Sequence, residues 1–220
     1  MGESIKRIVG PYQDSYSPNG IIGEKDACGV GFIANVNGIE SNWILKQSLK
    51  GLNCMEHRGG CGGDSDSGDG AGILCSIPWK YLEGEMNLEN IHNLVRGLGM
   101  VFMPNKKEKI EECKLICDQE AEKLKVNKTS WRTVPVNNEI LGPLAKANAP
   151  FICQWILYID KNDHKDTERL LFQLRKRIEK EIRETFKNHV GDCEFYFASL
   201  SSQTVVYKGM GVLKYYLNFI

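Results

Sequence analysis

The stretch EKDACGVGFIANV, residues 24–36, places a cysteine directly before a segment suited to a β-strand. In GVGFIANV, positions 30, 32, 34 and 36 share one face and positions 29, 31 and 33 share the other, which predicts a buried strand. Two interpretations of Cys28 follow. It is a small core residue, as a lone cysteine commonly is, or the chain is cut before it and it becomes an N-terminal nucleophile.

The residues before this stretch differ in character. Residues 1–23 are polar, contain proline and glycine, and show no sustained period, which predicts a leader without regular structure. They contain no apolar core of the length that a secretory signal requires. We therefore expect residues 1–23 to form a leader before the folded domain.

The composition argues against several classes of function. The 220 residues are 42% hydrophobic and 25% charged, which is typical of a globular protein. Lys+Arg and Asp+Glu both number 28, and the resulting net charge of zero gives no argument for binding nucleic acid or an anionic membrane surface. No run approaches the roughly 20 apolar residues of a transmembrane helix. We expect neither nucleic acid nor a membrane among the partners.

The eight cysteines are spread through predicted helices and strands, which is typical of a reducing compartment. Cys113 and Cys117 lie four residues apart on one face of a predicted helix and could in principle bind a metal. No second pair and no nearby histidine completes a tetrahedral set. The two are therefore interpreted as small apolar residues of a buried face, and no metal site is predicted.

Hydrophobic periodicity predicts helices and strands along the whole domain, and the grouping of the strands favours a layered α+β fold over a strict βαβ sheet. Asn37-Gly38 is a turn, and the last helix has Asp166 as its N-cap and a buried stripe of Leu171, Leu174, Ile178, Ile182 and Phe186. A first helix is expected from the helical spacing of Ile44, Leu45, Leu49, Leu52 and Met55, with its end at Gly59-Gly60. Further helices are expected over residues 87–97, 106–126 and 166–186. Strands are expected over residues 71–79, 97–104, 131–136, 150–160, 193–200 and 204–210, the last two as a hairpin.

Residues that could bind a ligand or take part in catalysis are concentrated in MEHRGGCGGDSDSGDGAGI, residues 55–73. Its seven glycines allow the backbone to approach a ligand closely. The stretch departs from the phosphate-loop, dinucleotide and calcium-loop patterns. Asp64 and Asp66 are interpreted as turn residues, and His57 as a structural residue. Arg58 either offers a bidentate fork to a carboxylate or is a cation at a helix C-terminus.

Three motifs, DACGVGF, GLNCMEHRGG and GDSDSGDGAGIL, in this order and spacing, resemble the start of the large subunit of the glutamate synthase family. The later segments KANAPFICQWILYI and ASLSSQTVVYKGM are similar to further parts of the same domain. The resemblance covers the chain from about Glu24 to Met210. The sequences of its motifs are most similar to those of the ferredoxin-dependent type found in oxygenic phototrophs.

This resemblance implies a class II glutamine amidotransferase domain with the Ntn-hydrolase fold, a four-layer αββα sandwich. It implies cleavage between Ala27 and Cys28, and therefore a leader over residues 1–27 before a domain over residues 28–220. It also implies a nucleophilic role for Cys28 and binding of the substrate α-carboxylate by Arg58. The α-amine of a new N-terminus has a pKa near ~8 and can act as the base for the adjacent thiol. The implied reaction converts glutamine to glutamate and ammonia for glutamate biosynthesis.

The resemblance also implies partners for the complete enzyme. The chain itself is expected to hold no cofactor. The remaining domains would carry FMN and an iron–sulfur cluster, would receive the ammonia, and would take electrons from ferredoxin. The expected location is the cytoplasm, or the plastid stroma in a photosynthetic eukaryote.

The end of the chain departs from the family pattern. The family's Asn-Gly pair of the oxyanion hole does not follow the KGM motif, and the loss of one oxyanion donor typically costs about 10²–10³ in rate. We therefore expect residues 28–220 to form the N-terminal part of the amidotransferase domain, a sandwich incomplete at its C-terminus and inactive by itself. The alternatives are an inactive remnant or split-enzyme fragment and, least favoured, a stand-alone amidotransferase of another pathway.

Overall fold

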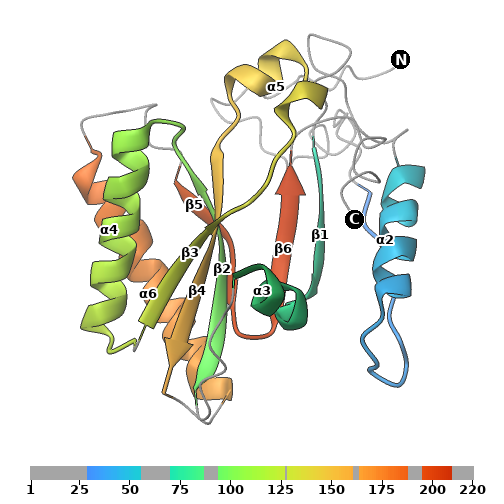
Figure 1. Ribbon diagram of the computed structural model, residues 1–220, viewed down its shortest axis with the longest axis horizontal. Coiled ribbons are helices and arrows are strands. Elements are labelled where there is room, and N and C mark those ends of the chain that lie inside the picture. The colour runs from blue at the N-terminus through green and yellow to red at the C-terminus, as the bar shows by residue number, and fades with distance from the viewer. Residues whose placement is uncertain are drawn as a thin grey trace, which may run out of the picture.

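The computed structural model describes residues 29–55, 70–86, 94–126, 128–160, 164–187 and 195–209. Within these ranges it combines helices with antiparallel strands, which confirms the α+β class (Figure 1). None of the helices described is long and apolar enough to cross a membrane. In chain order the elements are α2 (Asn42–Cys54), β1 (Ala71–Ser76), α3 (Trp79–Met86), β2 (Val95–Met103), α4 (Lys107–Lys123), β3 (Lys128–Thr133), the 3-10 turn η2 (Asn138–Ile140), α5 (Pro143–Ala147), β4 (Phe151–Ile159), α6 (His164–Thr185), β5 (Tyr196–Ser201) and β6 (Thr204–Gly209).

The larger sheet has four strands in the order β3-β4-β2-β5, and every neighbouring pair is antiparallel. Its two inner strands pair along their whole length, from Val95 opposite Ile159 to Met103 opposite Phe151. Both inner strands are buried over their last seven residues, without alternation. This burial on both faces explains why their sequences read as nearly continuous apolar runs.

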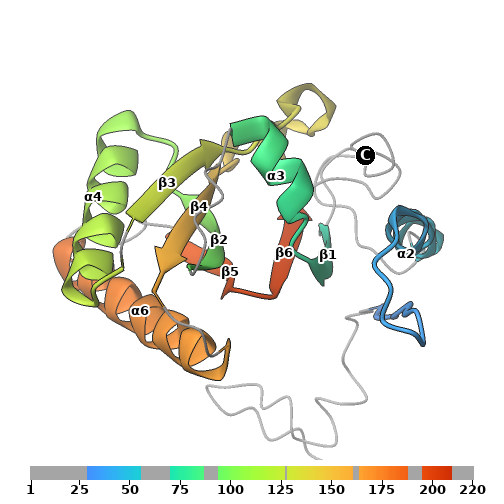
Figure 2. The ribbon, with the colours of Figure 1, turned by 60° about the horizontal axis from the view of Figure 1, so that its bottom comes forward.

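Helices α4 and α6 cover one face of this sheet (Figure 2). The five residues of the predicted stripe on α6 are all buried there, together with Ile110, Cys113, Cys117 and Ala121 of α4. They pack against Val101 and Met103 of β2 and against Trp155, Leu157 and Ile159 of β4. Gly97 of β2 allows this packing, because a Cβ at that position would lie 3.1 Å from the side chain of Leu171.

A second core lies on the opposite face, against the two-stranded sheet of β1 and β6 and against α3. It contains Leu98, Met100 and Phe102 of β2, Ile156 and Tyr158 of β4, Leu82 of α3 and Val205 of β6. Helix α2 lies beyond β1, on the far side from the larger sheet (Figure 1). The order of layers is therefore helices, sheet, sheet and helix, which agrees with the expected αββα sandwich.

One carboxylate joins α4 to two strands of the larger sheet. Asp118 accepts hydrogen bonds from the indole Nε1 of Trp155 (3.0 Å) and of Trp131 (3.0 Å) and from the hydroxyl of Thr129 (2.8 Å). The two tryptophan rings stack on each other with centroids 5.3 Å apart. Asp118 therefore accepts hydrogen bonds from the indole N–H groups of two tryptophans. This allows both tryptophans to contribute their large apolar rings to the packing of the core.

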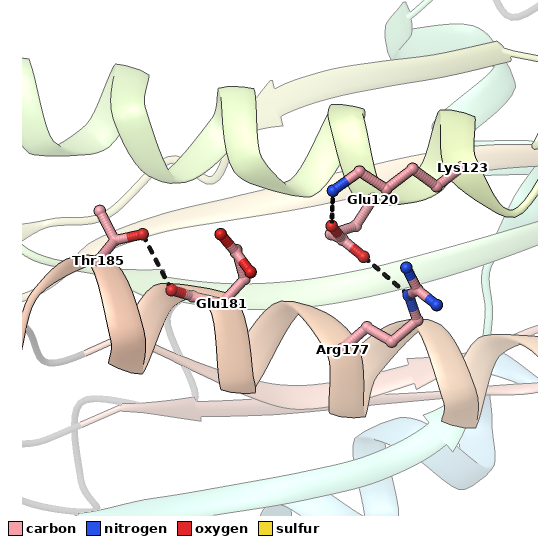
Figure 3. Close-up of polar contacts among 5 residues, drawn as sticks. All are labelled: Glu120, Lys123, Arg177, Glu181 and Thr185. Carbon is pink, nitrogen blue, oxygen red and sulfur yellow. Dashed lines mark hydrogen bonds and ion pairs between the residues drawn. The ribbon is translucent and has the colours of Figure 1, made fainter.

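A second polar contact links helix α4 to helix α6 (Figure 3). Glu120, whose side chain is 5% exposed, accepts from Arg177 Nε at 2.8 Å and also from Lys123. Burial by itself would raise the pKa of Glu120, but the hydrogen bonds and positive charges of Lys123 and Arg177 outweigh it and lower the pKa.

The prediction of a strand over residues 29–36 is wrong for this structure. The segment pairs with no strand among the described residues, and the side chains of Val30, Phe32 and Val36 are 93%, 94% and 101% exposed. Alternating apolar residues favour a strand only where a neighbouring strand supplies hydrogen bonds. The turn at Asn37-Gly38 is present, since the Gly38 N–H donates to the Asn35 carbonyl and Gly38 has a φ of 68°.

The expected β5–β6 hairpin is also corrected. Both strands form, but β6 pairs with β1 and β5 pairs with β2. Serine hydroxyls replace the ladder between them: the Val206 N–H donates to Ser199 Oγ at 3.0 Å, and the Thr204 N–H donates to Ser201 Oγ at 3.2 Å. The chain thus steps from one sheet to the other at this turn.

Two helix predictions need adjustment as well. Helix α6 begins at His164, so Asp166 lies in its first turn and is not the N-cap. The helix expected over residues 87–97 is wrong where it overlaps β2, because Val95 pairs with Ile159 there, and residues 87–93 lie outside the described ranges. Helix α3, which the periodicity did not predict, starts directly after Pro78, whose carbonyl accepts from the Leu82 N–H.

We expect Asp118→Ala to destabilise the protein by roughly 2–4 kcal/mol. The substitution leaves two indole N–H groups without their acceptor, and each buried unsatisfied donor costs about 1–3 kcal/mol. Urea unfolding followed by tryptophan fluorescence measures the loss. Glu122→Ala, at an exposed position of the same helix, is the matched control, and an equal effect of the two substitutions would contradict the role of Asp118.

The stability that Glu120 contributes should depend on pH. Because its pKa is lowered in the folded state, the contribution is complete above the unfolded-state value of about 4.3 and is lost as the pH falls through the lowered value. Glu120→Gln should cost about 1–2 kcal/mol at pH 7, a low figure because both cations are half exposed. Urea unfolding from pH 7 to pH 3 should show this difference shrinking, whereas a pH-independent difference would rule the ionic contribution out.

Candidate functional site

The proposed nucleophile Cys28, the cleavage position after Ala27 and the proposed carboxylate ligand Arg58 lie outside the described residues. So do His57, interpreted as a structural residue, and Asp64 and Asp66, interpreted as turn residues. Their roles stay predictions. The described elements do show which part of the fold carries these segments.

The elements that flank the glycine-rich motif meet at one end of the fold. Helix α2 ends at Cys54, and β1 begins at Ala71, which pairs with Gly209 at the end of β6. Figure 1 shows the C-terminal end of α2, the start of β1 and the end of β6 at the same end of the molecule. The chain therefore enters the motif from α2 and leaves it into β1 at this end of the molecule.

Gly72 of the motif has a structural reason to be glycine. A Cβ built on it would lie 2.9 Å from Lys208 Cβ and 2.9 Å from the carbonyl oxygen of Tyr207 on β6. Distances below 3.0 Å are closer than real side chains approach. At Gly72, β1 therefore lies so close to β6 that a residue with a side chain would not fit without moving one of the strands.

Lys208 marks the same end of the fold with a positive charge. Its Nζ lies 4.5 Å from the ring centroid of Tyr196 and 5.6 Å from that of Phe102. The two rings stack with centroids 4.8 Å apart. This cation–π contact fixes the direction of a long side chain at the surface, and sequence reasoning did not identify it because the three residues come from three different strands.

A polar network crosses the core between the two sheets. Arg132 donates to the buried Gln154 at 3.0 Å and to Glu85 at 3.1 Å, and Gln154 donates to the hydroxyl of Tyr207 at 3.3 Å. Burial raises the pKa of Tyr207, and the nearby Cys75 adds to the rise. Tyr207 therefore stays protonated near neutral pH, and the network links α3, β3 and β4 to β6.

Three thiols of the described ranges are poor nucleophiles. Burial raises the pKa of Cys75, of Cys117 and of Cys153, the last to about 11, so their thiolates are rare at neutral pH. Cys113 and Cys117 are fully buried in the α4 core, as the apolar interpretation predicted. Within the part of the chain that the structure describes, no three His, Cys, Asp or Glu residues are grouped to hold a metal ion.

Comparisons with known proteins assign the chain to a family. The family model described as "Glutamine amidotransferases class-II" matches residues 28–219, so the match begins at Cys28. The ferredoxin-dependent glutamate synthase 1, chloroplastic/mitochondrial, of Arabidopsis thaliana is 43% identical over 194 residues, which are 86% of this chain and 12% of the relative. The ferredoxin-dependent glutamate synthase of Pyropia yezoensis is 42% identical over 96% of this chain and 14% of the relative.

A bacterial relative gives the same result. The ferredoxin-dependent glutamate synthase 2 of a Synechocystis species is 39% identical over 86% of this chain and 12% of its own length. The chain thus spans about an eighth of the length of the curated relatives that it matches.

We expect Gly72→Ala to loosen the pairing of β1 with β6. The added methyl group requires one strand to move, at a cost of about 1–3 kcal/mol. Amide exchange at Ile73 and Cys75, which face β6, should become faster. Gly84→Ala in α3 is the control, because nothing lies within 4 Å of its Cβ position and alanine favours a helix. Unchanged exchange in Gly72→Ala would show that the close approach has no energetic weight.

Proposed function

The chain belongs to the class II glutamine amidotransferases, and we propose that it is the glutaminase part of a ferredoxin-dependent glutamate synthase. The observation that carries the proposal is the family match, which begins at Cys28, the residue that the motif DACGVGF marks as nucleophile. The names of the relatives support the glutamate synthase assignment. The α+β layers agree with this family.

The residue at the start of the domain supplies both the nucleophile and the base of the proposed reaction. Once the leader is removed, the α-amine of Cys28 accepts the thiol proton, and the thiolate attacks the side-chain amide carbon of glutamine. The C–N bond breaks, the amine returns the proton, and ammonia leaves. Water then hydrolyses the thioester and releases glutamate and the free thiol.

The properties of other thiols in the described ranges support Cys28 as the nucleophile, because those thiols are less suited to this role. Those of Cys75, Cys117 and Cys153 have raised pKa values in apolar surroundings, where a thiolate is unfavourable. Cys54 is exposed on α2, but it is an internal residue and has no α-amine beside its thiol. An N-terminal Cys28 combines nucleophile and base in one residue.

Arg58 is the proposed ligand for the substrate α-carboxylate. It follows α2 by four positions in the sequence and precedes Gly59 and Gly60, whose lack of side chains would leave room for a substrate beside its guanidinium. A planar guanidinium binds a carboxylate with two parallel hydrogen bonds.

The complete enzyme would have further parts. Its remaining domains would carry FMN and an iron–sulfur cluster, use the ammonia to convert 2-oxoglutarate to glutamate, and receive electrons from ferredoxin. Relatives from Arabidopsis thaliana and Oryza sativa carry chloroplastic names. We place this protein in the cytoplasm of a prokaryote or in the plastid stroma of a photosynthetic eukaryote.

We expect a glutamine-analogue diazo-ketone to alkylate Cys28 in the leader-free protein, extended by its downstream domain so that the site is complete. Cys28→Ser should abolish both the labelling and the hydrolysis of glutamine, because a hydroxyl is far less acidic than a thiol. Peptide mass spectrometry locates the label. Cys54→Ser, which removes an exposed thiol, should leave the labelling unchanged, and a label on Cys54 or Cys61 would refute the assignment.

Arg58→Lys should raise the KM for glutamine about ten- to a hundredfold in the same active protein. The substitution keeps the charge but loses the bidentate contact, which is worth roughly 1.5–3 kcal/mol. Steady-state glutaminase kinetics separate KM from kcat. An unchanged KM would leave Arg58 only the role of a cation at a helix end.

A further inference from the structure

Helices α4 and α6 form a layer whose outer side faces away from the larger sheet, and Figures 1 and 2 show no other described element over that side. Each helix has one large apolar side chain that does not enter the core. Leu115 of α4 is 57% exposed, and Phe172 of α6 is 59% exposed. Exposed apolar side chains that lie among charged ones are typical of surfaces that bind another protein.

The outer face of α4 is acidic. Its exposed residues follow one another at intervals of three or four and so form one line along the helix, opposite the residues that enter the core. This acidic line consists of Glu108, Glu111, Leu115, Gln119 and Glu122. Glu111 also pairs with Lys114 of the same helix at 3.1 Å, an exposed contact of low energy.

The outer face of α6 is basic and repeats the same intervals. This basic line consists of Arg169, Phe172, Lys176, Lys180 and Arg183, all of them exposed. It contains no acidic residue; Glu179, which pairs with Lys176 at 3.0 Å, is less exposed and lies to one side. Because the whole chain has a net charge of zero, the two lines are a separation of charge and not an excess of one sign.

The two lines lie side by side on one surface, since Figure 3 shows α4 and α6 as antiparallel neighbours joined through Glu120 and Arg177. A two-fold rotation about an axis between the helices places α4 of one copy on α6 of the other, and the reverse. A symmetric dimer requires such a self-complementary surface. The axis keeps heights along the helices, so Glu122, close to the Glu120 contact, faces Lys176 of the partner copy.

We propose that a second copy of this chain docks on the α4–α6 layer, with the acidic line of each copy against the basic line of the other. The contact covers Leu115 and Phe172. A layer about 25 Å long and about 20 Å wide buries roughly 1,000 Å² over both copies, the lower end for a specific interface. The dimer is therefore weak, and because its charge pairs are near solvent, salt weakens it further. The inference does not depend on the proposed chemistry.

Sedimentation velocity on the full chain, over a concentration series at low salt, tests the proposal. The unsubstituted chain should dimerise with increasing concentration and dissociate when salt is added. Glu122→Lys and Lys176→Glu should each raise the dimer Kd roughly tenfold or more, because the symmetry repeats the new like-charge contact twice. An equimolar mixture of these two variants should dimerise again, since each substituted residue then faces an opposite charge.

Glu139→Lys in η2 and Lys146→Glu in α5, at exposed positions outside the two helices, make the same charge changes and should leave the Kd unchanged. Urea unfolding checks that each variant is folded. A chain that stays monomeric at low salt and high concentration would overturn the proposal. So would association that Glu122→Lys and Lys176→Glu do not weaken, because another surface would then join the copies, and so would a mixture of the two variants that fails to associate.

Discussion

The antiparallel pairing of β2 with β4 is the constraint on which the described fold depends. All nine residues of each strand are paired, and both faces of the pair are covered. One face supports α4 and α6, and the other supports α3 and the smaller sheet. A one-residue slip of this register would exchange the two cores, moving Leu98 and Met100 under the helices and Val101 and Met103 toward β6. The layers on both sides therefore rely on a single ladder.

Polar groups in this fold act where they replace backbone pairing or satisfy large aromatic residues. Asp118 accepts from two stacked indoles, and Ser199 and Ser201 accept the amides of β6 that a hairpin partner would otherwise bind. Because the amides of Thr204 and Val206 have these acceptors, the chain can change sheets between β5 and β6 without leaving the two amides unpaired. The sheet-to-sheet step is thus encoded in side chains as well as in the backbone.

These features mark what the sequence could predict. The stripe of α6 and the apolar runs of β2 and β4 are local patterns, and the structure confirms them. The partner of β6 is not a local property, since it depends on serine hydroxyls and on a glycine at position 72 of a distant strand. Helix α3 was missed because Pro78 was interpreted only as the end of a strand, although a proline also fits the start of a helix. The motif residues Cys28 and Arg58 were identified through a family resemblance, and their geometry lies outside the described ranges.

The segments that carry the family motifs are attached to the least buried layer. Leu49 is the only fully buried residue described in α2, and β1 alternates between half-buried and exposed residues. By contrast, α4 and α6 are anchored by a continuous core and by the Glu120 contacts. Local opening is easiest where few apolar contacts and few paired amides must be lost. The helices and the larger sheet therefore form the stable base, and the layer of α2 and β1, which flanks the motif, is the part that can rearrange while the base stays folded.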